Sequence, residues 1–311
     1  TANVDGSGAS FNYNGADMTA GANIDASATS VAATLTGGAG GDTLAGGSSN
    51  DVIVGGAGAD QITANAGFDS IDGGSGNDTI IMGSNISLSD TIDGGAGTDS
   101  VTGTIGVATA QGFASISNVE NATFDFTAAG SFNAANTSMT VINVTAGTGV
   151  AATVNNIATG QRIDLEDTHL DGVTLDYAAD ATASIQTGIS TAITTDALTV
   201  TDAQTVNITT AGGADSAFDA VTLDATDTDF LTVTAGVAAS GLTATGAFAA
   251  DDVQTVTLTT SATNAHISLG AGSTFLNTAD KLTTLTINAD GDDSSDITVT
   301  ASGAGAAAAA L

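Results

Sequence analysis

The sequence predicts an all-β fold in which a coil of short repeats, residues 37–102, is followed by a longer Thr-rich β region. Three observations support this prediction: a nine-residue repeat, later segments that alternate aliphatic residues with Thr or Asn, and the lack of a convincing amphipathic helix. The alternation has the period of two that marks a strand with one buried face. We expect three domains: an N-terminal β segment or cap over 1–36, the repeat coil over 37–102, and a β-rich assembly region over 103–311.

The repeat is clearest when residues 37–102 are written nine at a time. The units read GGAGGDTLA, GGSSNDVIV, GGAGADQIT, ANAGFDSID and GGSGNDTII; three residues, 82–84, then interrupt the count before NISLSDTID and GGAGTDSVT. An aspartate holds the sixth place of every unit: Asp42, Asp51, Asp60, Asp69, Asp78, Asp90 and Asp99. A branched aliphatic residue holds the eighth place: Leu44, Ile53, Ile62, Ile71, Ile80, Ile92 and Val101. A fixed short period kept at two places indicates a solenoid.

The residue types at these places predict a cation cage. Glycines at the first places allow a tight turn with positive φ, and their carbonyl oxygens can converge on an ion. The aspartate adds an anionic oxygen, and on the short strand that follows it only the aliphatic residue at place eight points inward. Carbonyl and carboxylate oxygens suit Ca²⁺, whereas the unit offers no soft ligand for zinc or copper. The alternative, a flexible Gly-Asp linker, has no need of an inward aliphatic residue at every ninth position.

These units resemble the RTX nonapeptide G-G-x-G-x-D-x-U-x, whose calcium-bound form is a parallel β-roll. In that family two nonapeptides make one coil, so each ion lies between turns that are two units apart in sequence. The resemblance implies that one turn supplies the carbonyls of its second and fourth places and its aspartate. The next turn then supplies the carbonyls of its first and third places and its own aspartate, and the chain holds several Ca²⁺ ions.

The resemblance implies a ligand set for each ion. One ion would lie among Gly38, Gly40, Asp42, Gly55, Ala57 and Asp60, and another among Gly56, Gly58, Asp60, Gly73, Ser75 and Asp78. The opposite edge would hold a weaker site, because Ala64 and Asn65 replace both glycines of one unit; its ligands would be Gly47, Ser49, Asp51, Ala64, Ala66 and Asp69. The other candidate ligands lie on either side of the interruption at 82–84: Gly74, Gly76, Asp90, Gly94, Ala96 and Asp99.

The charge composition of the chain limits which classes of macromolecule it can bind. The chain of 311 residues has 34 acidic residues against two basic ones and a formal net charge of −32. This excludes nucleic acid and direct binding to an anionic membrane, because both need basic side chains. All but two of the acidic residues are aspartates, which favour turns and ion cages over helices. There is no cysteine, so no disulfide can stabilise the chain. An extracellular chain without disulfides needs another cross-link, and bound metal is the obvious candidate.

The ends and the flanks of the repeats add further expectations. The chain begins with Thr1 and no signal segment follows, so we expect a processed chain, a fragment, or export by another route. No apolar run approaches the ~20 residues of a membrane span. Residues 1–36 continue or cap the coil, with Phe11 and Tyr13 as an apolar plug or as part of a surface hairpin.

Residues 116–124, ISNVENATF, resemble the I-x-N-V-E-N stretch that follows RTX blocks in secreted bacterial proteins. Within it Glu120 either closes the last ion site or is a solvated turn carboxylate.

The Thr-rich region fits stacked sheets or an irregular solenoid, and the Ala-rich patch at 177–183 could hold a single helical turn. Repeated Thr-x-Thr fits either an ice-binding face or a solvated strand face. The strands are expected within 119–127, 139–145, 198–201, 203–210, 231–234, 253–260 and 281–288.

No catalytic constellation emerges from the sequence, which therefore predicts a protein that is not an enzyme. The two histidines, His169 and His266, lie in no ligand-spaced cluster, and P-loop, G-x-S-x-G and H-E-x-x-H motifs are absent. The polar patch at 166–171 is either a further cation site or, as we favour, a loop of ordinary acids.

Taken together, the repeat, the composition and the Thr-rich region resemble a bacterial surface-layer protein of the RTX type, secreted by a type I system. The resemblance implies an extracellular structural protein that folds and self-assembles on calcium binding. Its partners would be copies of itself, with a cell-surface polysaccharide as a candidate anchor. Two alternatives stay open: a calcium-rigidified filament or adhesin, and the carboxy-terminal export region of a secreted hydrolase.

Overall fold

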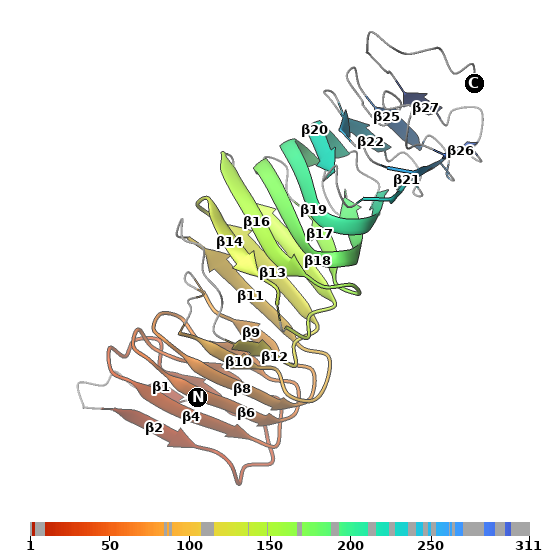
Figure 1. Ribbon diagram of the computed structural model, residues 1–311. Coiled ribbons are helices and arrows are strands. Elements are labelled where there is room, and N and C mark those ends of the chain that lie inside the picture. Colours follow the sequence, from red (N-terminus) through yellow and green to blue (C-terminus); the bar gives the residue numbers. More distant parts are fainter. Residues whose placement is uncertain are drawn as a thin grey trace. The chain divides into compact units, whose positions relative to one another are not determined.

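The computed structural model is all-β, and every regular element in the residues it describes is a strand (Figure 1). The described residues are 2–3, 10–83, 86, 89–106, 115–135, 137–147, 149–166, 170–187, 193–210, 216–223, 228–235, 241–244, 248–249, 253–260, 262, 265–269, 283–289 and 296–299. Parallel strands form a β-solenoid, which confirms the predicted fold class. The chain divides into two compact units, Thr1–Ile142 (unit 1) and Asn143–Leu311 (unit 2).

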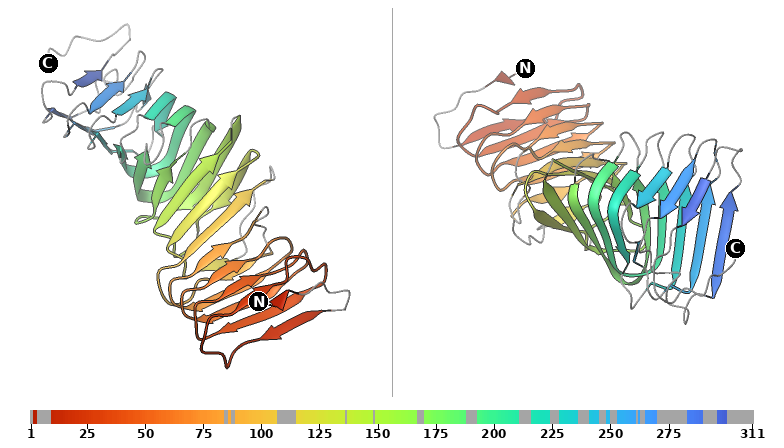
Figure 2. Two further views of the ribbon diagram at one scale, coloured as in Figure 1. Left: turned by 180° about the vertical axis from the view of Figure 1, so that it is seen from behind. Right: turned by 90° about the horizontal axis from the view of Figure 1, so that it is seen from above.

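Unit 1 consists of two parallel sheets made from alternate strands. One sheet has the order β12-β10-β8-β6-β4-β2, and the other joins the odd-numbered strands β1 to β13. Successive strands of each sheet lie side by side in Figure 1 and, coloured red to orange, in both views of Figure 2. The strands are β1 (Ala2–Asn3), β2 (Phe11–Asn14), β3 (Asn23–Asp25), β4 (Ala33–Gly38), β5 (Thr43–Ala45), β6 (Val52–Ala57), β7 (Gln61–Thr63), β8 (Ser70–Ser75), β9 (Thr79–Ile81), β10 (Thr91–Asp93), β11 (Ser100–Ile105), β12 (Ser115–Ser117), β13 (Asn121–Phe126) and β14 (Gly130–Asn133).

The core of unit 1 is built by the eighth place of each repeat. All seven aliphatic residues at this place, from Leu44 to Val101, are at most 1% exposed. They stack in register across each sheet, as in the pairs Leu44–Ile62 and Ile53–Ile71. The short strands and the strict alternation therefore follow from the repeat, because side chains of a strand alternate between its two faces. The largest buried side chains beyond the repeats include Phe124 and Phe132, whose ring centroids lie 4.3 Å apart.

The three-residue interruption does not break the stack. Before it, partner residues are 18 apart, as in Ile53 and Ile71. Across it they are 21 apart: Ile71 pairs with Ile92, and Ile80 pairs with Val101. Met82, the first residue of the interruption, is 1% exposed, so part of the extra loop fills the core and the coil keeps its register.

The N-terminal residues follow the same coil. Strand β2 pairs in parallel with β4, and β3 pairs in parallel with β5. Phe11 and Tyr13 lie on β2, half-buried, at the end of a parallel sheet. The hairpin reading is wrong, since a hairpin requires antiparallel strands.

Unit 2 also has only parallel pairings among its described strands. Two ladders run through it: β19, β21, β24 and β26 form one, and β20, β22, β25 and β27 form the other (Figure 1). The strands are β15 (Val141–Ala146), which begins in unit 1, β16 (Val150–Ile157), β17 (Arg162–Leu165), β18 (Leu170–Thr187), β19 (Ile193–Thr210), β20 (Ser216–Leu223), β21 (Phe230–Ala235), β22 (Gly241–Ala244), β23 (Phe248–Ala249), β24 (Thr255–Thr260), β25 (His266–Leu269), β26 (Thr284–Ala289) and β27 (Asp296–Val299). These strands confirm the Thr-rich β region.

The two longest strands bend at a corner of the coil. Asp180 in β18 and Asp202 in β19 each have φ of +60°, and the β18–β19 register shifts between Asp176 and Ala181. Aspartate tolerates this left-handed conformation better than most residues. The predicted helical turn at 177–183 is wrong, because Ala181 and Ala183 point into the core and pair with β19. No helix in the described ranges is long and apolar enough to cross a membrane.

Candidate metal centre

The aspartates of the repeats form two stacks, one at each edge of the unit 1 coil. In the first acid column, Asp42 N–H donates to Oδ1 of Asp60, Asp60 N–H to Oδ1 of Asp78, and Asp78 N–H to Oδ1 of Asp99, over 2.7–2.8 Å. In the second acid column, Asp51 N–H donates to Oδ1 of Asp69, and Asp69 N–H to Oδ1 of Asp90, both over 2.8 Å. Each carboxylate therefore holds the backbone of the preceding turn.

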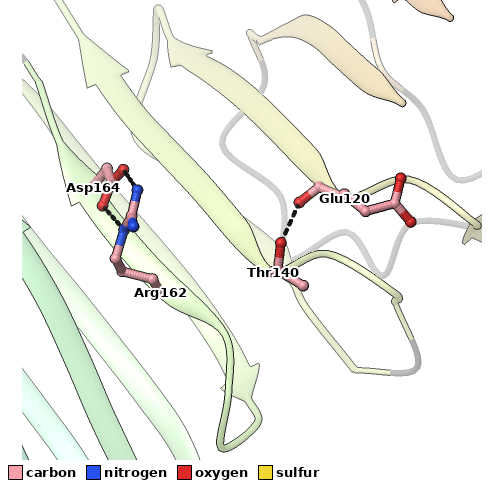
Figure 3. Close-up of polar contacts among 4 residues, drawn as sticks. All are labelled: Glu120, Thr140, Arg162 and Asp164. Atoms are coloured by element: carbon pink, nitrogen blue, oxygen red, sulfur yellow. Dashed lines mark hydrogen bonds and ion pairs between the residues drawn. The ribbon is translucent and has the colours of Figure 1, made fainter. Parts of the chain in front are cut away.

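Each column begins at an alanine. Ala22 N–H donates to Oδ1 of Asp42, and Ala33 N–H donates to Oδ1 of Asp51. The first column ends at Glu120, whose Oε2 accepts from Asp99 N–H over 2.8 Å. In the next turn Thr140 follows, and its N–H and Oγ1–H both donate to the Glu120 carbonyl, over 2.9 and 3.1 Å (Figure 3). The acids of this column thus run from Asp42 to Glu120.

The second oxygen of each aspartate in the first column has no hydrogen-bond partner. Oδ2 of Asp42, Asp60, Asp78 and Asp99 is buried and unpaired, and these four residues are at most 2% exposed. A buried carboxylate oxygen without a donor is costly, because it has lost water and gained nothing in return. Four such oxygens at corresponding places in successive turns make this edge of the coil suited to a positively charged ligand.

The space beside each of these oxygens is kept open by the first glycine of the unit. A Cβ built on Gly55 would overlap both Oδ2 of Asp60 and the carbonyl oxygen of Gly73 in the next turn. Gly37, Gly73 and Gly94 hold the same relation to the aspartate of their own unit and to a carbonyl of the following turn. A carboxylate oxygen and a backbone carbonyl of adjacent turns therefore border one shared space. Hard oxygen donors of this mixed kind are the ligands that Ca²⁺ takes.

The acid columns are electrostatically strained as they stand. Parallel strands lie about 4.8 Å apart, and two carboxylates at that distance repel by about 3.5 kcal/mol at an effective dielectric constant of about 20. Burial, and then the neighbouring aspartates, raise the pKa of Asp60 and of Asp69 to about 6. Burial also raises the pKa of Asp51, Asp78 and Asp99. A divalent cation between the turns would offset these shifts, because a nearby positive charge favours the ionised carboxylate.

The second column is built differently. Oδ2 of Asp51 accepts from Gly47 N–H over 2.6 Å, so a backbone donor satisfies an oxygen that is unpaired in the first column. The carbonyl oxygen of Gly47 accepts in turn from Ala66 N–H. Asn65, which replaces a glycine, has φ of +73°, and its amide donates to the Gly46 carbonyl over 2.8 Å. The substitutions in this unit are thus compensated by hydrogen bonds.

The residues predicted as ligands lie in adjacent turns of the same edge. Gly38 pairs with Gly56, Gly56 with Gly74, and Ala57 with Ser75. The isolated bridge between Ser75 and Ala96 continues this edge beyond the interruption. The assignment of individual carbonyls, at Gly38, Gly40, Gly58, Gly76 and the equivalent places, stays a prediction. Within the described residues no three His, Cys, Asp or Glu side chains gather as a metal cluster, and the cage inferred here differs because it depends on backbone carbonyls.

Comparison with known families agrees with this geometry. Residues 32–62, 54–85 and 89–107 match the family model of the RTX calcium-binding nonapeptide repeat. This part of the chain is an RTX repeat block. It covers about a quarter of the chain, and RTX nonapeptide repeats bind calcium. No curated protein and no solved structure gives a significant match to the chain.

One polar ladder in unit 2 was not anticipated from the sequence. Nε2 of Gln204 donates to Oδ2 of Asp229 over 3.3 Å, and Nε2 of Gln254 donates to Oδ1 of the same carboxylate. The backbone follows the same course: Asp229 N–H donates to the Gln204 carbonyl, and Gln254 N–H donates to the Asp229 carbonyl. Here two amides flank one carboxylate, so this ladder is satisfied without an ion.

The single arginine also neutralises a buried acid. Arg162 donates through Nε and Nη2 to the two carboxylate oxygens of Asp164, both over 2.6 Å (Figure 3). The bidentate geometry is the strong form of this pair. Of the polar patch at 166–171, residues 167–169 lie outside the described residues, so its candidate cation site stays a prediction.

Proposed function

We propose that this chain is a secreted structural protein that folds on calcium binding and self-assembles into a layer at the bacterial cell surface. The observation that carries the proposal is the set of four buried, unpaired carboxylate oxygens in the first acid column. RTX repeat proteins are generally secreted, and their β-solenoid is typically structural.

The proposed mechanism follows from electrostatics. Where calcium is scarce, as in the cytosol, stacked carboxylates repel one another and the repeat block does not close. Where calcium is abundant, ions enter between the turns, neutralise the columns and hold adjacent turns together. Binding free energy then becomes folding free energy, because the unfolded chain has no preformed site. Secretion in an unfolded state and folding outside the cell are both consistent with this scheme.

Self-assembly is supported by an uncharged face in unit 2. Three outward columns cross β19, β21, β24 and β26, and their register places uncharged residues, most of them threonines, side by side. The columns are Thr205, Phe230, Thr255 and Thr284; Asn207, Thr232, Thr257 and Thr286; and Thr209, Thr234, Thr259 and Asn288. A face without charge in a chain of net charge −32 suits contact with a second copy, since interface cores are depleted in charge.

A calcium titration followed by far-UV circular dichroism and light scattering tests the proposal. We expect β content to rise with calcium, and particles to grow only after folding is complete. Equal β content in calcium and in chelator would refute calcium-dependent folding. Folding without growth at any calcium concentration would refute self-assembly alone, and electron microscopy of the particles distinguishes a planar layer from a filament.

A matched pair of variants tests the assembling face. Thr257→Lys places a charge at the centre of the uncharged face, and Thr34→Lys places the same charge on an exposed position of β4 in unit 1. Both variants should fold in calcium. We expect Thr257→Lys to abolish particle growth and Thr34→Lys to retain it; growth of both would assign assembly to another surface.

A further inference from the structure

The first acid column continues one residue beyond the RTX repeats, and this extra member is a glutamate. Glu120 lies outside the matched residues, which end at 107. Its Oε2 accepts from Asp99 N–H over 2.8 Å, as each aspartate of the column accepts from the one before it. Asn118 and Glu120 are only two residues apart, whereas Gly94 and Asp99 are five apart. The shorter turn is therefore combined with a side chain that is longer by one methylene group.

The backbone at this turn also reproduces the turn of a repeat. A Cβ built on Gly94 would overlap the carbonyl oxygen of Asn118 and lie 2.9 Å from Oδ2 of Asp99. In the preceding turn, Gly73 has the same relation to the carbonyl of Gly94 and to Oδ2 of Asp78. Asn118 has φ of +51°, the left-handed conformation that asparagine tolerates. Its side-chain amide donates to Oδ1 of Asp93 over 2.7 Å, which fixes the turn against the coil below.

A buried oxygen points to a ligand here. Asp99 is 0% exposed and its Oδ2 has no partner, although Oδ1 is satisfied by Asp78 N–H. In the repeats the equivalent oxygen borders the same space as a backbone carbonyl of the next turn, and here that carbonyl belongs to Asn118, two residues before Glu120. The Glu120 carbonyl is already used by Thr140 and Val141, so the carboxylate is the group left to face Asp99.

We propose that Asp99, the Asn118 carbonyl and the Glu120 carboxylate form an additional Ca²⁺ site that closes the first acid column. The site uses residues outside the nonapeptide pattern and ends the stack, because the next turn presents Thr140, a neutral residue. The inference rests on the proposed calcium-dependent fold of the repeats, but it concerns one ion at the end of the stack.

Native mass spectrometry of the full chain at saturating calcium tests this site by counting ions. Glu120→Gln keeps a carbonyl oxygen as acceptor for Asp99 N–H and removes the charge. Asp180→Asn is the matched control, because it removes one charge from an exposed position of β18 in unit 2, where asparagine also tolerates the φ of +60°. We expect Glu120→Gln to bind one ion fewer than the wild-type chain and Asp180→Asn to bind the same number.

The outcomes separate this site from the proposed function. An unchanged ion count in Glu120→Gln overturns the additional site while leaving the repeats as calcium sites. A wild-type chain that binds no calcium overturns both. If Glu120→Gln does not fold, crystals of the wild-type chain grown with terbium decide the matter: an anomalous peak between Asp99 and Glu120 supports the site, and its absence beside peaks in the repeats refutes it.

Discussion

In a parallel coil, polar side chains at the corners of successive turns are stacked on one another, and unit 1 and unit 2 satisfy these side chains in two different ways. In both, a polar residue at a corner of each turn meets its equivalent in the next turn. Unit 1 fills the corner with carboxylates, at steps of 18 or 21 residues, and leaves four oxygens unpaired. Unit 2 places Gln204, Asp229 and Gln254 at steps of 25 residues, and both oxygens of the single carboxylate accept from amides.

The difference indicates where a cation is needed. A carboxylate beside a carboxylate requires a positive partner, whereas a carboxylate between two amides does not. The Gln-Asp-Gln ladder therefore needs no ion, whereas under the proposed mechanism the acid columns depend on calcium. A coil built from both designs would have one part that responds to calcium and one that is indifferent to it.

Removal of calcium by a chelator should produce the largest difference in stability between the two units. With excess EDTA, we expect unit 1 to lose its β structure and become sensitive to proteases, while β18, β19, β21 and β24 of unit 2 remain protected. Limited proteolysis followed by mass spectrometry identifies the surviving core. Equal resistance of both units in EDTA would contradict the assignment of the cation requirement to the acid columns.

Acid should partly replace calcium in unit 1. The pKa of Asp60 and of Asp69 is about 6 in the folded chain, above the ordinary value of 3.8. The folded unit then binds protons more tightly than the unfolded chain, so without calcium its stability is greatest near pH 4 and is lost as pH rises through about 6. Calcium affinity should change in the opposite sense, because its ligands must be deprotonated.

The measurement is circular dichroism against pH, in EDTA and in calcium. β content that rises as pH falls from 7 to 4 in EDTA supports the account, as does a weaker calcium response at the acid end. A flat profile in EDTA would show that the acid columns do not control folding.

A pair of glycine substitutions contrasts the two units at the backbone. Gly56 has φ of +114°, and a Cβ there would overlap the Gly38 carbonyl oxygen, whereas a Cβ on the exposed Gly147 would meet nothing within 4 Å. Gly56→Ala should lower the free energy of unfolding in calcium by more than about 2 kcal/mol, because the conformation alone costs about 1–2 kcal/mol. Gly147→Ala should be neutral or stabilising by about 0.4–1 kcal/mol. Thermal unfolding in calcium measures both, and equal effects would contradict the tight turn.

The smallest expected effect concerns the amide ladder. Gln254→Leu removes one donor from the half-buried Asp229 and should destabilise unit 2 by about 1 kcal/mol, equally in calcium and in EDTA. Gln61→Leu, on an exposed position of β7, should change stability by less than about 0.5 kcal/mol. Denaturant unfolding of both variants checks this; a calcium-dependent loss in Gln254→Leu would mean that the ladder also holds an ion.

The sequence was most informative where one place of the repeat had one physical role. The spacing of aspartates and aliphatic residues predicted the strands, the inward column and the acid stacks. It did not predict that the register would survive the interruption at 82–84, because this depends on Met82 entering the core. Nor did it settle the role of Glu120, since a lone glutamate in a turn carries no signal until its partner Asp99 is known.

The ladder of unit 2 was missed for a different reason. Gln-Thr-Val follows an apolar residue at both Ala203 and Val253, and by itself this shared pattern indicates only the alternation of a strand. Its step of 25 residues is long, and Asp229 between the two copies is preceded by Thr228 and followed by Phe230, so the motif is not repeated there. Only the register of β19, β21 and β24 brings the three side chains together.

The most direct test is residue-resolved amide exchange of the full chain in calcium and in EDTA. The amides of Asp42, Asp60 and Asp78 each donate to the carboxylate of the next turn, so they report on the stack itself. At calcium about 100 times its dissociation constant, linkage predicts exchange slower than in EDTA by about 100-fold for each ion that opening releases, with the Asp229 and Gln254 amides unchanged. Equal protection of the three aspartate amides in both media would contradict the account.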